Sequence, residues 1–370
     1  MGITDPVPET SASLPHAVLA QLDQGSDWVG SWWPAVALAG LAILAVAWWS
    51  RRRKLRKRTL APLALVLVLL AAAVGATLNA WSGYVPSTAA GGLLLTGHLD
   101  LAHGGQLRAV RIPVPKRLNL PGSDTYIYTP PGFDASGRTR YPVVYLMHGT
   151  PGTSADWFAA GGAGQAMDVL LQHHLVQPMI LVAPDLSGRR IADTECLDST
   201  RAGGPQLETY LSSVVVPWVD THYPTQPDWG HRAIGGMSMG GFCALDQGLR
   251  HQELYGVVLA LEPYDNPGSG GRAMLGTQAD FVSHSPGSYV SRMSFRHPVA
   301  CFLDVGSKAR GADSVATIRL VQQLRDRRQP VLFREEPGQE HTWTMARHGL
   351  PYGLVFASAH MPPASRDLGA

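Results

Sequence analysis

A serine flanked by glycines is the residue of this sequence best suited to covalent chemistry. Ser238 lies in the run Gly-Met-Ser-Met-Gly-Gly at 236–241. A short strand is expected before it, and a helix over Gly241–Arg250 after it. This context is typical of a nucleophile elbow, a tight turn that exposes a serine hydroxyl at a helix N-terminus. The flanking glycines fit, because side chains there would clash in such a turn. Ser238 is therefore the predicted nucleophile.

A histidine near the end of the chain has the position of a general base. His341 lies in Pro-Gly-Gln-Glu-His-Thr-Trp at 337–343, directly after the last expected strand. Imidazole titrates near neutral pH and can take the proton of a serine hydroxyl. The order in which the nucleophile comes first and the histidine last is that of α/β-hydrolases. We predict that His341 is the base that serves Ser238.

A second glycine-rich loop can supply hydrogen-bond donors to a developing negative charge. It reads His-Gly-Thr-Pro-Gly at 148–152 and follows an apolar strand. Such loops direct a backbone N–H toward the substrate oxygen, together with the N–H of the residue after the nucleophile. The expected oxyanion donors are therefore the amides of Thr150 and Met239. His148, at the strand end, is expected to shape the loop rather than to act as a base.

These loops require a framework of strands and helices. The apolar runs Val143–Met147 and Met179–Ala183 are unbroken, which is typical of strands buried on both faces. An amphipathic helix is predicted over Leu207–Val219, with Pro217 kinking or ending it. This alternation predicts a mostly parallel sheet with helices on both faces. The other expected strands are Arg108–Val114, Thr125–Tyr128, Ala233–Gly236, Gly256–Leu261, Ala300–Val305 and Val331–Glu335.

The first part of the chain has a different composition. No charged residue occurs over 28–50 or over 59–86, and each stretch is long enough to cross a membrane as a helix. Seven of the eight residues at 51–58 are cationic. The positive-inside rule places this loop in the cytoplasm and both flanks outside. The acidic start of the chain argues against a cleaved signal peptide, which begins with basic residues.

The chain is thus expected to have a membrane part and a catalytic part. Residues 28–83 form two transmembrane helices joined by the basic loop 51–58, and residues 107–360 form an α/β-hydrolase domain. The protein is expected in the cell membrane, with this domain outside the cytoplasm. The remaining segments are an extracytoplasmic N-terminal tail over 1–27, a linker over 84–106 and a C-terminal tail over 361–370.

Several motifs of the second part together resemble the esterase D group of α/β-hydrolases, which includes S-formylglutathione hydrolase, enterochelin esterases and the secreted mycolyltransferases. The resemblance covers roughly Leu107 to Phe356. It implies the α/β-hydrolase fold and a serine esterase or acyltransferase that needs no metal or organic cofactor. The motifs are Tyr145–Gly149, Ala183–Asp185, Gly236–Gly241, Leu303–Gly306, and Pro330–Arg334 followed by His341–Trp343.

The carboxylate that would orient the histidine is missing from the place that the resemblance implies. The group carries it three residues past the glycine that ends the seventh strand, and after Gly306 that position is Ala309. Asp313, in the loop four residues further on, is the preferred acid, and Asp304 within the strand is the second choice. The remaining alternatives are Glu335, Glu336, Glu340 and no acid at all.

Composition excludes several classes of protein. A charged fraction of 16% argues against a disordered chain or a coiled coil, and a net charge of +2 argues against nucleic-acid binding. No metal-binding spacing of His, Cys or acidic residues occurs, so no metal is expected. Of Cys196, Cys243 and Cys301, at most two can pair, and Cys243 is expected to be buried and free.

Two loops are candidates for the rim of the site. The charged segment Asp193–Ser199 can border the substrate or can be a solvated loop with local ion pairs. The segment Pro263–Ser294 is rich in Gly, Asn, Ser and Pro and lies where a lid would be inserted.

The sequence therefore predicts a membrane-anchored, extracytoplasmic serine hydrolase that cleaves carboxylic esters through an acyl-enzyme. The anchor suggests a lipid, aminoacyl-lipid or envelope-glycan ester as substrate. An acyltransferase of mycolyltransferase type would use the same triad, and a degenerate binding module would keep the fold without the chemistry. The sequence does not indicate a protein partner.

Overall fold

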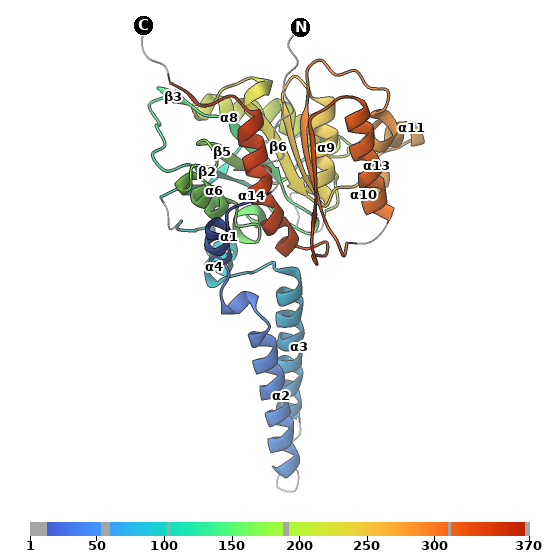
Figure 1. Cartoon of the computed structure of the whole chain (residues 1–370). Helices are drawn as coiled ribbons and strands as arrows, with labels where there is room; N and C mark the ends of the chain where they lie inside the picture. The colour runs from blue at the N-terminus through green and yellow to red at the C-terminus, as the bar shows by residue number, and fades with distance from the viewer. Residues whose placement is uncertain (1–12, 53–59, 102–103, 188–191, 310–311, 367–370) are drawn as a thin grey trace.

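The structure is a computed structural model that describes residues 13–52, 60–101, 104–187, 192–309 and 312–366. Its main body is a sheet covered by helices, and two long helices project together from one end of it (Figure 1).

The sheet has eight strands in the order β1-β2-β5-β4-β6-β7-β8-β9. β1 pairs with β2 and β2 with β5 in antiparallel fashion, and all the other pairs are parallel. The predicted α/β-hydrolase fold is confirmed. The strands are β1 (Gln106–Arg111), β2 (Asp124–Thr129), β4 (Val143–Met147), β5 (Ile180–Ala183), β6 (Arg232–Met237), β7 (Val257–Leu261), β8 (Ala300–Gly306) and β9 (Val331–Glu336), with β3 (Thr139–Arg140) and β10 (Ser365–Arg366) pairing separately.

The core lies in two layers because successive strand residues point to opposite faces. In β4, Tyr145 packs into one layer and Leu146 into the other, and both are fully buried. The first layer includes α9 (Met239–Arg250) and α13 (Ala312–Asp326), and the second includes α5 (Asp156–Ala159), α6 (Ala163–Gln172) and α14 (Trp343–His360). The sheet is therefore buried on both faces, as the apolar runs predicted.

The helix predicted over Leu207–Val219 extends further than expected. It consists of α7 (Leu207–Tyr210), a π-helical stretch (Leu211–Val215) and α8 (Val216–His222). Proline lacks an amide hydrogen, and its ring collides with the carbonyl four residues earlier in a regular α-helix. The wider π stretch precedes Pro217, which then lies in the first turn of α8. Pro217 therefore does not end the helix, which continues to His222 after the change of helix type.

Two helices, α2 (Trp33–Arg52) and α3 (Leu60–Ser82), pack side by side away from the sheet (Figure 1). Their segments Trp33–Arg51 and Ala61–Ser82 are long and apolar enough to cross a membrane, and only 11% and 6% of these segments are buried. Exposed apolar side chains distinguish them from the core helices of a soluble protein. Most of the basic loop, residues 53–59, lies outside the described residues.

Both ends of this helical pair are attached to the main body. α1 (His16–Asp23) precedes α2, and α4 (Thr88–Thr96) follows α3. Val18 of α1 and Leu93 of α4 are buried in the second core layer. The segments expected to be a tail and a linker therefore contain helices that pack on the domain, so both flanks of the pair lie on one side (Figure 1).

The candidate lid after β7 is helical. It contains the short helices α10 (Gly268–Met274), α11 (Gln278–Ser283) and α12 (Pro286–Tyr289), and Phe281 and Val290 from this segment are buried in the first core layer. The segment is therefore packed on the domain. Three 3-10 turns complete the described structure at Trp28–Gly30, Lys116–Leu118 and Trp229–His231.

Candidate active site

Ser238 lies in the tight turn between β6 and α9. Its φ of 60° and ψ of −119° are rare for a residue with a side chain. The backbone is held there because the Ser238 N–H donates to the carbonyl of Leu261 at 3.0 Å. A side chain at Gly236 would collide with the carbonyl of Gly240, and one at Gly240 with the carbonyl of Met147. The structure thus shows the geometry of a nucleophile elbow.

Ser238 and His341 line one cavity of about 580 Å³. Ser238 enters it from the end of β6, and His341 from the loop between β9 and α14. The loop at 149–152 forms another part of the wall. The structure therefore brings the predicted nucleophile, base and oxyanion loop together, although β4, β6 and β9 are far apart in the sequence.

Glu262 is the carboxylate beside the imidazole. Its Oε2 lies 3.4 Å from Nδ1 of His341, and only 4% of its side chain is exposed. Its Oε1 accepts a hydrogen bond of 2.7 Å from the Gly306 N–H. Glu262 directly follows β7 and has a positive φ of 49°. A buried, hydrogen-bonded carboxylate in this place can fix the orientation and tautomer of the ring.

Among the acids proposed from the sequence, those with described side chains lie elsewhere. Asp304 is buried in β8 and pairs with Arg334 at 3.8 Å, and burial together with the nearby Glu336 carboxylate raises its pKa. Glu336 also pairs with Arg334, at 2.7 Å. Glu335 is exposed. Asp313 belongs to the first turn of α13, and its side chain lies outside the described residues.

A signal for Glu262 was present in the sequence. The buried run Val257–Leu261 forms β7, the strand that follows β6 in the chain, and Glu262 is the first polar residue after this run. The carboxyl ends of parallel strands meet at one edge of a sheet, where polar side chains form sites. The turn after Gly306, where the family resemblance implies an acid, instead contacts the histidine loop, because the Lys308 N–H donates to the Gln339 carbonyl at 2.8 Å.

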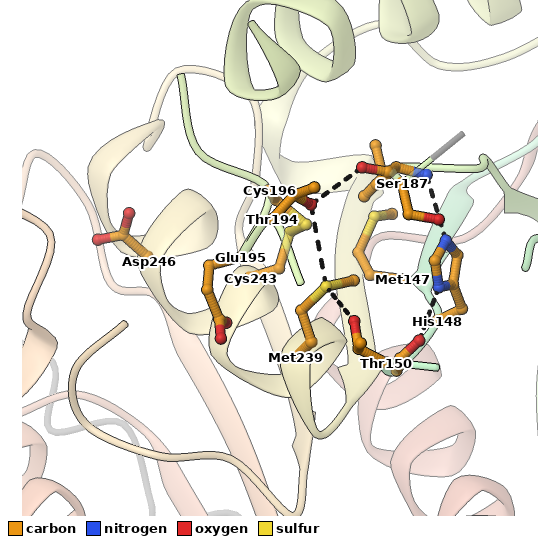
Figure 2. The surroundings of a disulfide bond; sticks show 12 residues. Met147, His148, Thr150, Ser187, Thr194, Glu195, Cys196, Met239, Cys243 and Asp246 are labelled. Atoms are coloured by element: carbon orange, nitrogen blue, oxygen red, sulfur yellow. Dashed lines mark hydrogen bonds between the residues drawn. A yellow bond between two sulfur atoms is a disulfide. The ribbon is translucent and has the colours of Figure 1, made fainter. Parts of the chain in front are cut away.

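The two expected oxyanion residues are in contact. The Thr150 hydroxyl donates to the sulfur of Met239 at 2.9 Å, and Figure 2 shows this sulfur between the hydroxyls of Thr150 and Thr194. A Cβ at Gly149 would lie 3.4 Å from the Ser238 Cβ, so this loop passes directly beside Ser238. Met239 is the first residue of α9, and the backbone N–H groups at a helix N-terminus can donate hydrogen bonds to an anion.

His148 is buried behind this loop. Its Nδ1 lies 2.9 Å from the Gly149 carbonyl, and its Nε2 accepts a hydrogen bond of 3.2 Å from the Leu186 N–H (Figure 2). These contacts join the oxyanion loop to the segment after β5. His148 thus has the contacts of a loop-shaping residue.

Residues 123–359 match the model of a protein family described as "Putative esterase". The chain belongs to this esterase family. It is 31% identical over 145 residues to Esterase Rv1288 of Mycobacterium tuberculosis, an alignment that covers 39% of this chain and 29% of that protein. The chain spans about a third or less of the length of the curated relatives it matches.

Solved structures agree with the family. A ferulic acid esterase is 25% identical and superposes with a TM-score of 0.60 over 70% of this chain and 100% of its own. S-formylglutathione hydrolase from Agrobacterium tumefaciens, at 18% identity, shares the fold with a TM-score of 0.60 over 71% and 98% of the two chains. The resemblance to the esterase group is confirmed.

A disulfide lies beside the nucleophile helix of this esterase domain. Cys196, in the loop before α7, is bonded to Cys243 of α9, and both are fully buried (Figure 2). The expectation that Cys243 is free was wrong, because the fold brings a loop distant in sequence onto this helix. Cys301 is buried and unpaired.

Glu195, next to this disulfide, is a buried carboxyl group. The Tyr264 hydroxyl donates to it at 2.7 Å, and the Tyr264 ring stacks on Phe242 of α9. Burial, and then the negative charge of Asp193, raise the pKa of Glu195 to about 9. The candidate rim segment Asp193–Ser199 is therefore packed against α9 at this point, with a neutral glutamic acid at pH 7.

One cluster of the described residues has the composition of a metal site. The ligand atoms of Glu208, Asp246 and His284 all lie within 4.8 Å of one another. The Arg250 guanidinium lies among them, 3.5 Å from Glu208 and 3.4 Å from Asp246, and it also contacts His284. A cationic side chain thus already neutralises the acids, and the residues do not fit a metal ion.

Proposed function

We propose that this protein is a serine esterase that cleaves carboxylic esters at the Ser238 cavity. The observation that carries the proposal is the shared cavity of Ser238 and His341, with Glu262 buried behind the imidazole. A strained nucleophile, a base and an acid that orients the base are the parts that acyl transfer requires.

The geometry supports a two-step mechanism. Ser238 Oγ attacks the ester carbonyl while His341 takes its proton, and the Thr150 and Met239 amides hold the oxyanion. The intermediate collapses as His341 returns this proton to the leaving alcohol. Water then attacks the acyl-enzyme, His341 takes a proton from it, and the same proton restores the Ser238 hydroxyl as the acid leaves.

In this proposal Glu262 takes the role that the sequence suggested for Asp313. Its carboxylate faces Nδ1–H of His341 and, without taking that proton, stabilises the imidazolium that forms during each proton transfer. The Gly306 amide holds the other oxygen, so the carboxylate keeps its orientation through the reaction.

We also propose that α2 and α3 anchor the esterase in the cell membrane as two spans, with the domain outside the cytoplasm. Their exposed apolar surface, and the packing of both flanks on one side of the domain, support a hairpin. The basic loop 51–58 joins α2 and α3 at the end of the pair that points away from the domain. Its positive charge supports a cytoplasmic position for that end. A substrate at the membrane, such as a lipid, aminoacyl-lipid or envelope ester, follows from this topology.

Active-site labelling tests the chemistry. Full-length protein in detergent is treated with a fluorescent fluorophosphonate, which reacts with activated serines, beside Ser238→Ala and the control variant Ser288→Ala, at a partly exposed serine that does not line the cavity. Wild type and Ser288→Ala should label, and Ser238→Ala should not. Absence of labelling in folded wild type would contradict the proposal and favour a binding module. Added alcohols then separate hydrolysis from acyl transfer, since a transferase makes the new ester in preference to the free acid.

A further inference from the structure

One wall of the cavity at Ser238 comes from a membrane-length helix. Gly75, Leu78, Asn79 and Ser82 of α3 line it together with Ser238 and His341. Residues spaced by three, four and seven positions lie on one helix face. From Ser82 to Gly75 this face runs about 10 Å along α3, at 1.5 Å per residue.

The end of α3 is joined to both loops that carry the proposed chemistry. The indole N–H of Trp81 donates to Glu340, next to His341, at 2.6 Å. The Tyr84 hydroxyl donates to Asp156 at 2.9 Å, and the same carboxyl group accepts from the Thr153 N–H at 3.0 Å. The wall is therefore held in register with the histidine loop and the oxyanion loop.

The wall is apolar and has room along it. A Cβ added at Gly75 would meet nothing within 4 Å, and 57% of Leu78 is exposed. The amide of Asn79 is already engaged, since it donates to the Val85 carbonyl at 3.0 Å and accepts from the Val85 N–H at 2.8 Å. The remaining surface suits hydrocarbon better than a sugar or a charged group.

We propose that the Gly75–Ser82 face of α3 is a binding subsite for the apolar tail of an amphiphilic ester. The tail lies against Gly75 and Leu78 and stays in the membrane, while the ester carbonyl reaches Ser238 from the membrane side. The inference rests on the proposed esterase activity and on membrane insertion. It makes α3 part of the substrate site as well as an anchor.

The test compares tailed with short esters, using full-length protein in lipid vesicles. The substrates are 4-methylumbelliferyl butyrate, 4-methylumbelliferyl palmitate, with a long acyl half, and hexadecyl butyrate, with a long alcohol half. Gly75→Leu places a side chain into the proposed tail path. Gly40→Leu is the matched control, because Gly40 of α2 also has nothing within 4 Å of an added Cβ and does not line the cavity.

We expect Gly75→Leu to reduce kcat/KM for a tailed ester about 10-fold more than it reduces kcat/KM for the short ester. Gly40→Leu should change neither. The tail subsite would be overturned if Gly75→Leu lowered kcat/KM equally for all three esters, or did not lower it for the tailed ones. It would also be overturned if the wild-type protein hydrolysed only the short ester. If wild type cleaves none of them and does not label with fluorophosphonate, the proposed function itself fails.

A second measurement does not depend on the folding of a variant. A fluorophosphonate whose hexadecyl chain carries a diazirine is attached to Ser238 in wild type, and the protein is then illuminated and mapped by mass spectrometry. Crosslinks to the α3 peptide that contains Gly75 and Leu78 support the proposal. Crosslinks confined to the esterase domain or to lipid overturn it.

Discussion

The Glu262 carboxylate lies 3.4 Å from Nδ1 of His341 and is held by the Gly306 amide. Of the two groups, the imidazole is half exposed to the cavity and the carboxylate is almost fully buried. A buried acid behind an accessible base fixes the imidazole orientation without contacting substrate.

Replacement of Glu262 should therefore impair chemistry more than binding. We expect Glu262→Gln to lower kcat for a short ester by about 10²- to 10⁴-fold, because the amide favours the wrong tautomer of His341. Steady-state kinetics measure the effect. Asp304→Asn is the matched control, since that acid pairs with Arg334, and its activity should stay within about tenfold of wild type. A larger loss in Asp304→Asn than in Glu262→Gln would refute the assignment.

The contact between Trp81 and Glu340 should position the histidine loop. Trp81→Phe removes the indole donor, and we expect kcat for the short ester to fall about 3- to 10-fold, in keeping with a free energy of about 1 kcal/mol for one solvent-exposed hydrogen bond. Trp33→Phe, in an exposed tryptophan of α2, should have wild-type activity. Glu340→Gln keeps an acceptor oxygen and should retain more activity than Glu340→Leu; equal activity of these two variants would argue against a positioning role.

Stability should depend on pH through Glu195. Its pKa is raised to about 9 by burial, from an ordinary value of 4.5. The neutral form is thus favoured by folding, so its contribution to stability is present below pH 4.5 and is lost as the pH rises through 9. Between pH 6 and pH 10, the Tm of wild type should fall more than that of Glu195→Gln. Differential scanning fluorimetry checks this, with the exposed Glu335→Gln as a control that should follow wild type.

The disulfide should stabilise the contact between the rim loop and α9. Cys196 and Cys243 are 47 residues apart, so their disulfide closes a loop of that size. Reduction of the disulfide is expected to lower the free energy of unfolding by about 2–4 kcal/mol. Urea unfolding with and without a reductant measures this change. In the double variant Cys196→Ser/Cys243→Ser, the reductant should have no effect; an equal effect there would assign the loss to another cause.

Local sequence patterns determined the elements of this protein. Unbroken apolar runs predicted β4 and β5, because a strand covered on both faces has no polar side to expose. The glycines around Ser238 predicted the elbow, since their immediate neighbours leave no space for side chains. The two charge-free stretches likewise predicted α2 and α3 from length and composition alone.

Contacts between distant segments were decided only by the tertiary structure. Glu262 meets His341 because the sheet order brings the ends of β7, β8 and β9 together, and no local spacing encodes that adjacency. Cys196 meets Cys243 for the same reason. The wall that α3 gives to the Ser238 cavity depends on the angle at which a helix leaves the domain. Hydrophobic patterns specify which face of a helix or strand is buried, whereas the packing of whole helices and strands decides which distant residues come into contact.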